Sequence, residues 1–128
     1  MNRDELNIIS KQIVDACICV HKEMGPGLLE SVYEYCLLKE LELRGLNAQS
    51  QVVIPLHYKG ELLSKDFRID ILVENHIILE LKAVDTILPV HKAQIISYLK
   101  LADKKLGLLL NFNVNLMKNG INRFVNNF

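Results

Sequence analysis

The stretch FRIDILVENHIILELK, residues 67–82, decides how this chain folds. It divides into two runs of mostly branched apolar residues around residues 74–76, a pattern that predicts two β-strands joined by a short turn. Asp70, Glu80 and Lys82 place charges inside these apolar runs. Because a buried charge is costly unless it is paired or bound to a metal ion, these three residues mark the candidate functional site.

The predicted hairpin brings the three charges together. Glu80 and Lys82 are two residues apart, so on a strand they point to the same face. If residues 74–76 form the whole turn, Asp70 faces Glu80, with about 5 Å between the Cβ atoms of directly opposed side chains. Two carboxylates at this distance repel each other, and a shared proton or a divalent cation relieves the repulsion. Lys82 lies one step further along, beside any bound cation.

Three motifs in this order are similar to those of a known family. Asp70, followed after nine residues by Glu80-Leu81-Lys82, resembles the D…(D/E)xK signature of the PD-(D/E)xK nuclease superfamily. Residues 27–33, GLLESVY, match the pattern that names the small GxxExxY proteins of that superfamily. Residues 94–98, QIISY, resemble the QxxxY element of RecB-like members. The proline that often precedes the first aspartate is absent here.

The resemblance implies a restriction-endonuclease-like core and a metal-dependent phosphodiesterase that acts on nucleic acid, with DNA favoured over RNA. Oxygen atoms would hold Mg²⁺ or Mn²⁺, hard cations that prefer such ligands, and the implied ligands are Asp70, Glu80, the Leu81 carbonyl and Glu30. Lys82 would orient the attacking water or stabilise the transition state. Gln94 and Tyr98 would position the substrate backbone, and Gly27 would clear space for the sheet.

Plainer interpretations stay open for several of these residues. Glu30 falls in the first turn of a predicted helix, where the helix dipole favours any carboxylate. Gln94 and Tyr98 could belong to a solvated helix face with one amphipathic aromatic residue, and His91 reads as a surface residue or a phosphate contact. The whole chain could also be a binding or regulatory module that keeps the nuclease fold without turning over substrate.

The rest of the chain predicts an α/β fold. Apolar periodicity and turn residues indicate helices over 4–24, 28–44 and 89–102, and strands over 50–58, 61–73, 77–84, 106–112 and, at the end, 121–127. Strand, helix, strand connections are normally right-handed and give parallel neighbours. We therefore expect a mixed sheet, an antiparallel meander plus a parallel strand, with helices on both faces.

Finer expectations follow from single residues. Pro55 predicts an edge strand or a bulge, because proline cannot donate to a sheet ladder. The helix over 89–102 places His91, Gln94, Tyr98 and Leu101 on one stripe. The helical period predicts that a separate apolar set packs elsewhere: Val90, Ala93, Ile96 and Leu99. On the second helix the expected apolar side includes Leu29.

Composition narrows the class of protein. A chain of 128 residues predicts a single domain over 1–128, and a homodimer is left open. The first residues do not resemble a secretory signal and no apolar run is long enough for a membrane helix, so a cytoplasmic location is expected. Three cysteines without a CxxC pair predict buried free thiols. Net charge is zero, but residues 65–128 carry 9 basic against 6 acidic residues.

Overall fold

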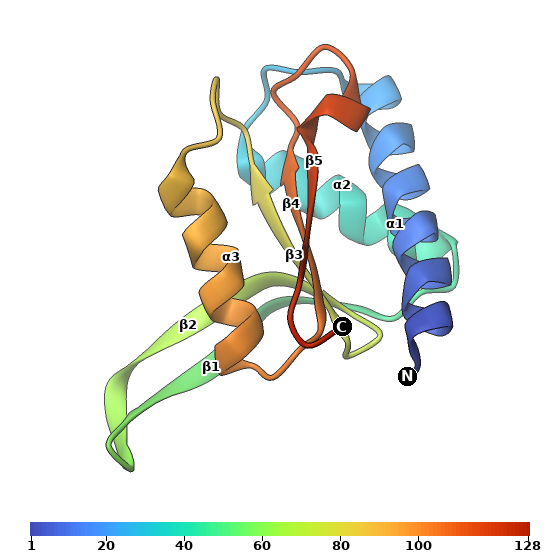
Figure 1. Cartoon of the computed structure of the whole chain (residues 1–128). Coiled ribbons are helices and arrows are strands. Elements are labelled where there is room, and N and C mark those ends of the chain that lie inside the picture. The colour runs from blue at the N-terminus through green and yellow to red at the C-terminus, as the bar shows by residue number, and fades with distance from the viewer.

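The computed structural model describes residues 1–128 as a five-stranded mixed sheet with helices on both faces (Figure 1). In chain order the elements are α1 (Arg3–Met24), α2 (Glu30–Leu43), β1 (Ala48–Tyr58), β2 (Glu61–Val73), β3 (Ile77–Lys82), α3 (Pro89–Leu101), β4 (Leu106–Asn111), a 3₁₀ turn η1 (Met117–Gly120) and β5 (Ile121–Val125). No helix is long and apolar enough to cross a membrane.

The sheet has the predicted topology. The strands lie in the order β1-β2-β3-β4-β5, with β3 and β4 parallel and every other neighbouring pair antiparallel. Val73 pairs with Ile77, so residues 74–76 form the whole connection between β2 and β3. Glu74 and Asn75 both have positive φ, 50° and 59°, which suits the twist of a tight hairpin. The predicted α/β fold with an antiparallel meander plus a parallel strand is therefore confirmed.

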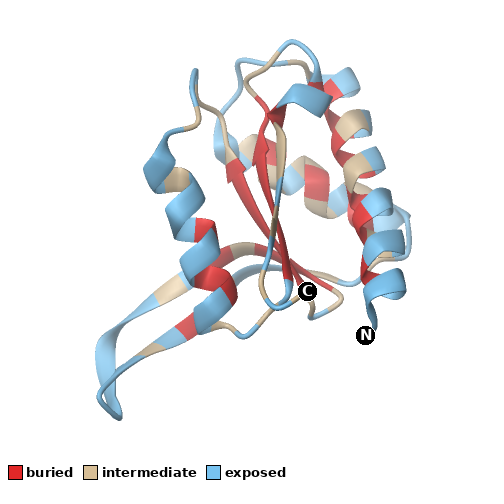
Figure 2. Ribbon diagram, in the orientation of Figure 1, coloured by how far each residue is buried: buried red, intermediate tan, exposed pale blue.

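Both faces of the sheet are buried, as the sequence of β3 predicts. Ile77, Leu79 and Leu81 face the larger core cluster, to which α1 and α2 contribute. Ile78 faces a smaller cluster with residues of α3. Buried segments line the side of each helix that meets the sheet (Figure 2). A strand with both faces covered is expected to read as a nearly continuous apolar run.

The hairpin of β1 and β2 extends beyond the body of the protein (Figure 1). β1 is an edge strand, and its pairing with β2 shifts register between Pro55 and His57, so both interpretations of Pro55 are confirmed. The tip carries exposed apolar side chains, among them Tyr58 and Leu62. Lys59, with a φ of 49°, and Gly60 form the turn at the tip.

The connection between α1 and α2 is shaped by its backbone. Gly27 has a φ of 97°, a conformation that favours glycine, and a Cβ at this position would meet no atom within 4 Å. The expectation that Gly27 clears space for the sheet is therefore wrong, and its backbone conformation explains the glycine instead. The side chain of Tyr33 lies in the core with its ring stacked on Phe112 at a centroid distance of 4.6 Å.

Two expectations about packing are also wrong. Val90, Ala93 and Ile96 are exposed, because only the side of α3 with Ile95, Tyr98 and Leu99 faces the sheet and no element covers the other side. Leu29 is 73% exposed because it caps the start of α2 rather than forming part of its apolar side.

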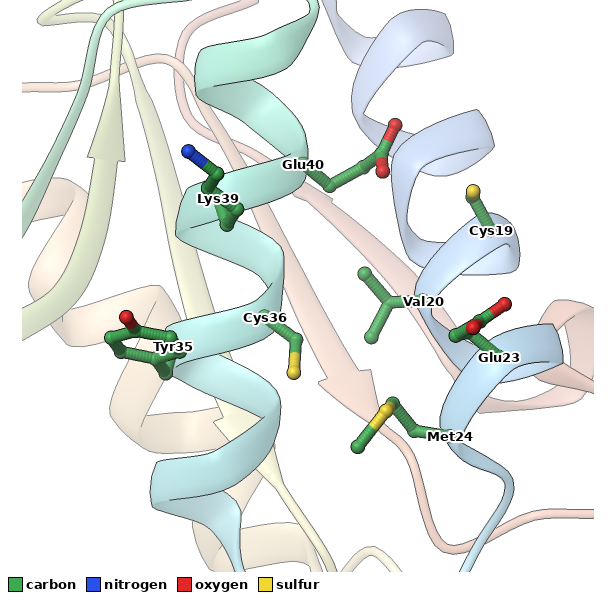
Figure 3. A pocket seen from close by; sticks show the side chains of 8 residues that line it. All are labelled: Cys19, Val20, Glu23, Met24, Tyr35, Cys36, Lys39 and Glu40. Atoms are coloured by element: carbon green, nitrogen blue, oxygen red, sulfur yellow. The ribbon is translucent and has the colours of Figure 1, made fainter.

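The three free thiols differ in burial. Cys17 is buried, as predicted, whereas Cys19 is exposed and Cys36 is partly exposed. Cys19 and Cys36 line a cleft of about 260 Å³ between α1 and α2 (Figure 3). Cys19 is exposed because its position on α1 faces the rim of this cleft rather than the sheet. None of the predicted site residues lines this cleft.

Candidate active site

The candidate site lies where β2 and β3 separate. Their paired register ends at Ile71 and Leu79, and the next residues toward the open end are Asp70 and Glu80. There the side chains replace the ladder: the backbone N–H of Asp70 donates to Glu80 Oε2 at 2.8 Å, and the N–H of Leu81 donates to Asp70 Oδ2 at 2.9 Å. The two carboxylates therefore face each other across the opening, as the short turn predicts.

The other side of Asp70 is irregular as well. β1 pairs Ser50 with Ile71 and Val52 with Ile69, but the ladder omits Gln51 and Asp70. Ile69 and Ile71, two residues apart on β2, pack in different core clusters, so the alternation of side chains changes phase at Asp70. Such a local disruption re-aims a side chain, and it is common beside active sites.

Burial raises the pKa of both carboxyl groups of this pair. Desolvation, with the nearby charge of Asp70, raises the pKa of Glu80 to about 8. Desolvation also raises the pKa of Asp70, against the hydrogen bond from Leu81 and the charge of Lys82. The charged form of each group is disfavoured because little water reaches it. Near neutral pH the cation-free pair therefore keeps a proton, one of the two ways in which the sequence predicts that the repulsion is relieved.

Asp70 opens onto a cleft of about 230 Å³. The cleft is lined by residues of α2, β1, β2 and β3: Glu30, Ser31, Glu34, Gln51, Asp70 and Leu81. Three predicted site residues, Glu30, Asp70 and Leu81, thus share one cavity. Glu80 is only 4% exposed and lies behind this lining, held by the backbone of Asp70.

Comparisons with known proteins identify the family and the fold of this chain. The family model of the PD-(D/E)XK nuclease superfamily matches residues 7–124. The chain belongs to this superfamily. The description of this superfamily is that of nucleases.

A solved structure shares the fold. The crystal structure of SSO0001 matches 73% of this chain with a TM-score of 0.51 and 23% sequence identity. The match covers 47% of SSO0001, so this chain spans about half the length of that protein. A likeness at this identity concerns the fold alone. No curated protein matches the chain.

The lysine of the superfamily motif, Lys82, is partly buried at the end of β3. Its charge lowers the pKa of both Asp70 and Glu80, so it lies close to them, but it forms no ion pair within 4 Å; the one such pair in the molecule joins Arg44 and Glu40. The ammonium group of Lys82 therefore lies near the two carboxylates without forming an ion pair with either.

The residues of the QxxxY element do not line the carboxylate cleft. Tyr98 is 7% exposed and packs on Phe67 at a ring-centroid distance of 4.9 Å, and its hydroxyl accepts a hydrogen bond from Gln94 Nε2 at 3.1 Å. Burial and the charge of Glu80 raise the pKa of Tyr98, so its ring lies near the site from the α3 side. Gln94 is exposed, and His91 accepts a hydrogen bond from the N–H of Leu88 at the start of α3. A substrate-positioning role for Gln94 and Tyr98 stays a prediction.

The chemistry of the donors fits a hard divalent cation. Asp70 and Glu80 each use one carboxylate oxygen to bind the backbone of the neighbouring strand, and no protein donor is bound to Asp70 Oδ1 or Glu80 Oε1. No three His, Cys, Asp or Glu side chains already stand in an arrangement that could hold a metal ion. Glu30 would therefore have to turn toward the pair, which its exposed position in the first turn of α2 allows.

Sequence reasoning missed two residues of the cleft, Glu34 and Gln51. Glu34 Oε1 accepts a hydrogen bond from Gln51 Nε2 at 2.9 Å, and Glu34 Oε2 accepts one from Ser50 Oγ at 3.4 Å. Glu34 follows Glu30 by four residues, so helical periodicity could have placed both carboxylates on one face. Gln51 had no such signal, because its place depends on the register of β1.

Proposed function

We propose that this chain is a Mg²⁺- or Mn²⁺-dependent phosphodiesterase that cleaves nucleic acid, with DNA favoured over RNA. The observation that carries the proposal is the reciprocal pair of hydrogen bonds where β2 and β3 separate. It fixes Asp70 and Glu80 face to face and leaves one oxygen atom of each carboxylate without a protein donor. Two desolvated carboxylates in this position destabilise the fold unless they bind a proton or a cation.

In the proposed site, Asp70 and Glu80 hold the cation, and the Leu81 carbonyl and Glu30 supply further oxygen ligands. A bound divalent cation offsets charge on a phosphate and makes a nearby water more acidic. Lys82 completes the site as a donor: its ammonium group, free of any ion pair, orients the attacking water or contacts the phosphate as negative charge develops. The exposed side of the cleft leaves room for the substrate backbone.

We also propose that the chain is a GxxExxY member of the superfamily, because its structure gives the three motif residues a joint role. The hydroxyl of Tyr33 donates to the carbonyl of Gly25 at 2.5 Å and accepts from the N–H of Leu28 at 3.1 Å. Gly27 supplies the left-handed backbone between these two contacts. Together they fix the loop that leads into α2, and Glu30 begins that helix at the edge of the cleft.

The direct test is cleavage of single- and double-stranded DNA and RNA with Mg²⁺, with Mn²⁺ and with EDTA. Wild type should cleave at least one substrate in a cation-dependent way. Asp70→Asn should lose both cation binding and cleavage. Lys82→Ala should bind Mn²⁺ in calorimetry but lose about 10²- to 10³-fold in rate, the usual cost of removing one group that stabilises the transition state.

Lys100→Ala is the matched control, because Lys100 is an exposed lysine on α3 away from the cleft lining. This variant should cleave as wild type does. A Lys82→Ala protein that no longer binds Mn²⁺ would show that Lys82 has been given the wrong role. Cation binding by wild type without cleavage of any substrate would favour the non-catalytic binding module.

A further inference from the structure

The backbone of Gln51 has a conformation that residues other than glycine seldom adopt. Its φ of 53° lies in the left-handed region, which glycine tolerates and other residues seldom enter. It is not at a turn: Ser50 before it and Val52 after it both pair with β2. A strained residue inside a strand persists only where its surroundings hold it, and such residues cluster at functional sites.

The strained backbone directs the side chain of Gln51 into the cleft. Nε2 of Gln51 donates to Glu34 Oε1 at 2.9 Å, and Gln51 and Glu34 line the same cavity as Asp70. Gln51 also lies opposite Asp70, because the residues on either side of it on β1 pair with the residues on either side of Asp70 on β2. Gln51 thus lies between a carboxylate of α2 and the first carboxylate of the nuclease motif.

Glu34 differs from its neighbour Glu30 in its contacts. Both carboxylate oxygens of Glu34 accept hydrogen bonds from β1, one from Gln51 and one from Ser50, whereas Glu30 has no hydrogen-bond partner for its side chain and is exposed. A carboxylate whose two oxygens are already engaged by donors is suited to orienting those donors. Glu30 is the one whose oxygens are available to a ligand.

We propose that Gln51 and Glu34 are positioning residues: Glu34 orients the amide of Gln51, and this amide holds the carboxylate of Asp70 toward the cleft. This inference rests on the proposed function only in its consequence, which is tighter cation binding by Asp70. The arrangement of Glu34, Gln51 and Asp70, called the brace below, is a property of the cation-free protein. It gives a reason for the gap in the ladder, since a regular pair of Gln51 with Asp70 would leave the Gln51 backbone extended and its side chain directed elsewhere.

Calorimetry with Mn²⁺ on four variants tests the consequence. Gln51→Gly removes the amide and suits the left-handed backbone, so the protein should stay folded. Gln51→Gly and Glu34→Ala should each weaken Mn²⁺ binding about tenfold, as loss of a residue that orients a metal ligand usually does. Glu34→Gln should restore binding, because its amide oxygen still accepts from Gln51. Gln49→Ala, two residues away and exposed on the same strand, should bind as wild type does.

Two results would overturn the proposal. Glu34→Gln as weak as Glu34→Ala would identify Glu34 as a ligand rather than a brace. Gln51→Gly with unchanged affinity would show that the amide does not position Asp70. Thermal melts of the same variants separate these results from a general loss of folding, since a purely structural role lowers the melting temperature without changing the affinity of the folded protein.

A second measurement does not depend on any cation. In the spectrum of ¹⁵N-labelled protein in EDTA, the side-chain amide of Gln51 is identified by its absence from Gln51→Gly. Asp70→Asn and Glu34→Ala should each shift this resonance, whereas Asp103→Asn, at an exposed site outside the cleft, should leave it unchanged. An unmoved resonance in Asp70→Asn would refute the brace. If wild type binds no Mn²⁺ while Asp70→Asn and Glu34→Ala still shift the Gln51 resonance, the proposed function is contradicted and the brace is not.

Discussion

Asp70 and Glu80 each bind the backbone of the opposite strand with one carboxylate oxygen, so they take the place of a ladder pair where β2 and β3 separate. This arrangement satisfies the backbone donors but confines two acidic groups in a desolvated space. Burial is the main cause of the raised pKa of both groups. The charge of Asp70 raises the pKa of Glu80 further. The stability of the cation-free protein should therefore depend on the protonation of this pair.

Cation-free protein should become less stable as pH rises toward 8. The pKa of Glu80 is about 8 in the folded protein against an ordinary value of 4.5, so between these limits the folded state holds a proton that the unfolded state has lost. Stability from this group is complete below about pH 4.5 and is lost as pH rises through the folded pKa. Glu80→Gln should remove most of this decline and exceed wild type by roughly 4 kcal/mol at pH 8, at about 1.4 kcal/mol per pKa unit.

Urea unfolding in EDTA across this pH range measures the effect. Glu80→Gln is a suitable variant because its amide oxygen still accepts from the N–H of Asp70. Glu61→Gln, at an exposed position near the tip of the hairpin, is the control and should follow wild type. Parallel curves for wild type and Glu80→Gln would contradict a raised pKa at this residue.

At the scale of elements, the hairpin of β2 and β3 could be predicted because its information is local. A short turn and the two-residue period of strands set which side chains face each other. The position of Asp70 opposite Glu80 could therefore be predicted by counting residues from the turn. α3 was harder: its apolar residues encircle the helix, and periodicity alone does not tell which stripe faces the sheet. The place of Gln51 could not be predicted, because it comes from a break in the ladder between β1 and β2 and from a left-handed backbone that no local pattern encodes.

Tyr98 tests the packing of α3. Tyr98→Ala should lower the free energy of unfolding by about 3 kcal/mol, the usual cost of deleting a buried aromatic ring. Tyr98→Phe keeps the ring against Phe67 and loses only the hydrogen bond with Gln94, so it should cost about 1 kcal/mol or less. Urea unfolding measures both. An alanine variant as stable as the phenylalanine variant would contradict the burial of this ring.

The outer part of the β1–β2 hairpin should open more readily than the rest of the sheet. Residues 57–65 are all exposed, and few buried contacts oppose local opening there. Amide hydrogen exchange should therefore be faster for this segment than for β3 and β4, whose residues are almost all buried. Equal protection across the hairpin and β4 would show that the tip is held by contacts absent from this structure.

Across the whole molecule, two core clusters share one sheet. α1 and α2 cover one face, α3 covers the other, and β3 and β4 contribute to both clusters. Glu80 lies on β3, whose neighbouring residues belong to both clusters, so the site and the core depend on the same strand. Binding of a cation to the folded state alone should therefore stabilise the entire fold by mass action.

Thermal unfolding of wild type and Asp70→Asn, each in EDTA and with Mn²⁺, tests most directly that Asp70 and Glu80 form a cation site. In EDTA, Asp70→Asn should be more stable than wild type by roughly 1 kcal/mol, because it removes the desolvated charge that the singly protonated pair still carries and functional sites often trade stability for activity. Mn²⁺ at a hundredfold excess over Kd should stabilise wild type by about 2.7 kcal/mol and leave Asp70→Asn almost unchanged. A wild type whose melting is the same with Mn²⁺, with Mg²⁺ and with EDTA would contradict the cation site itself.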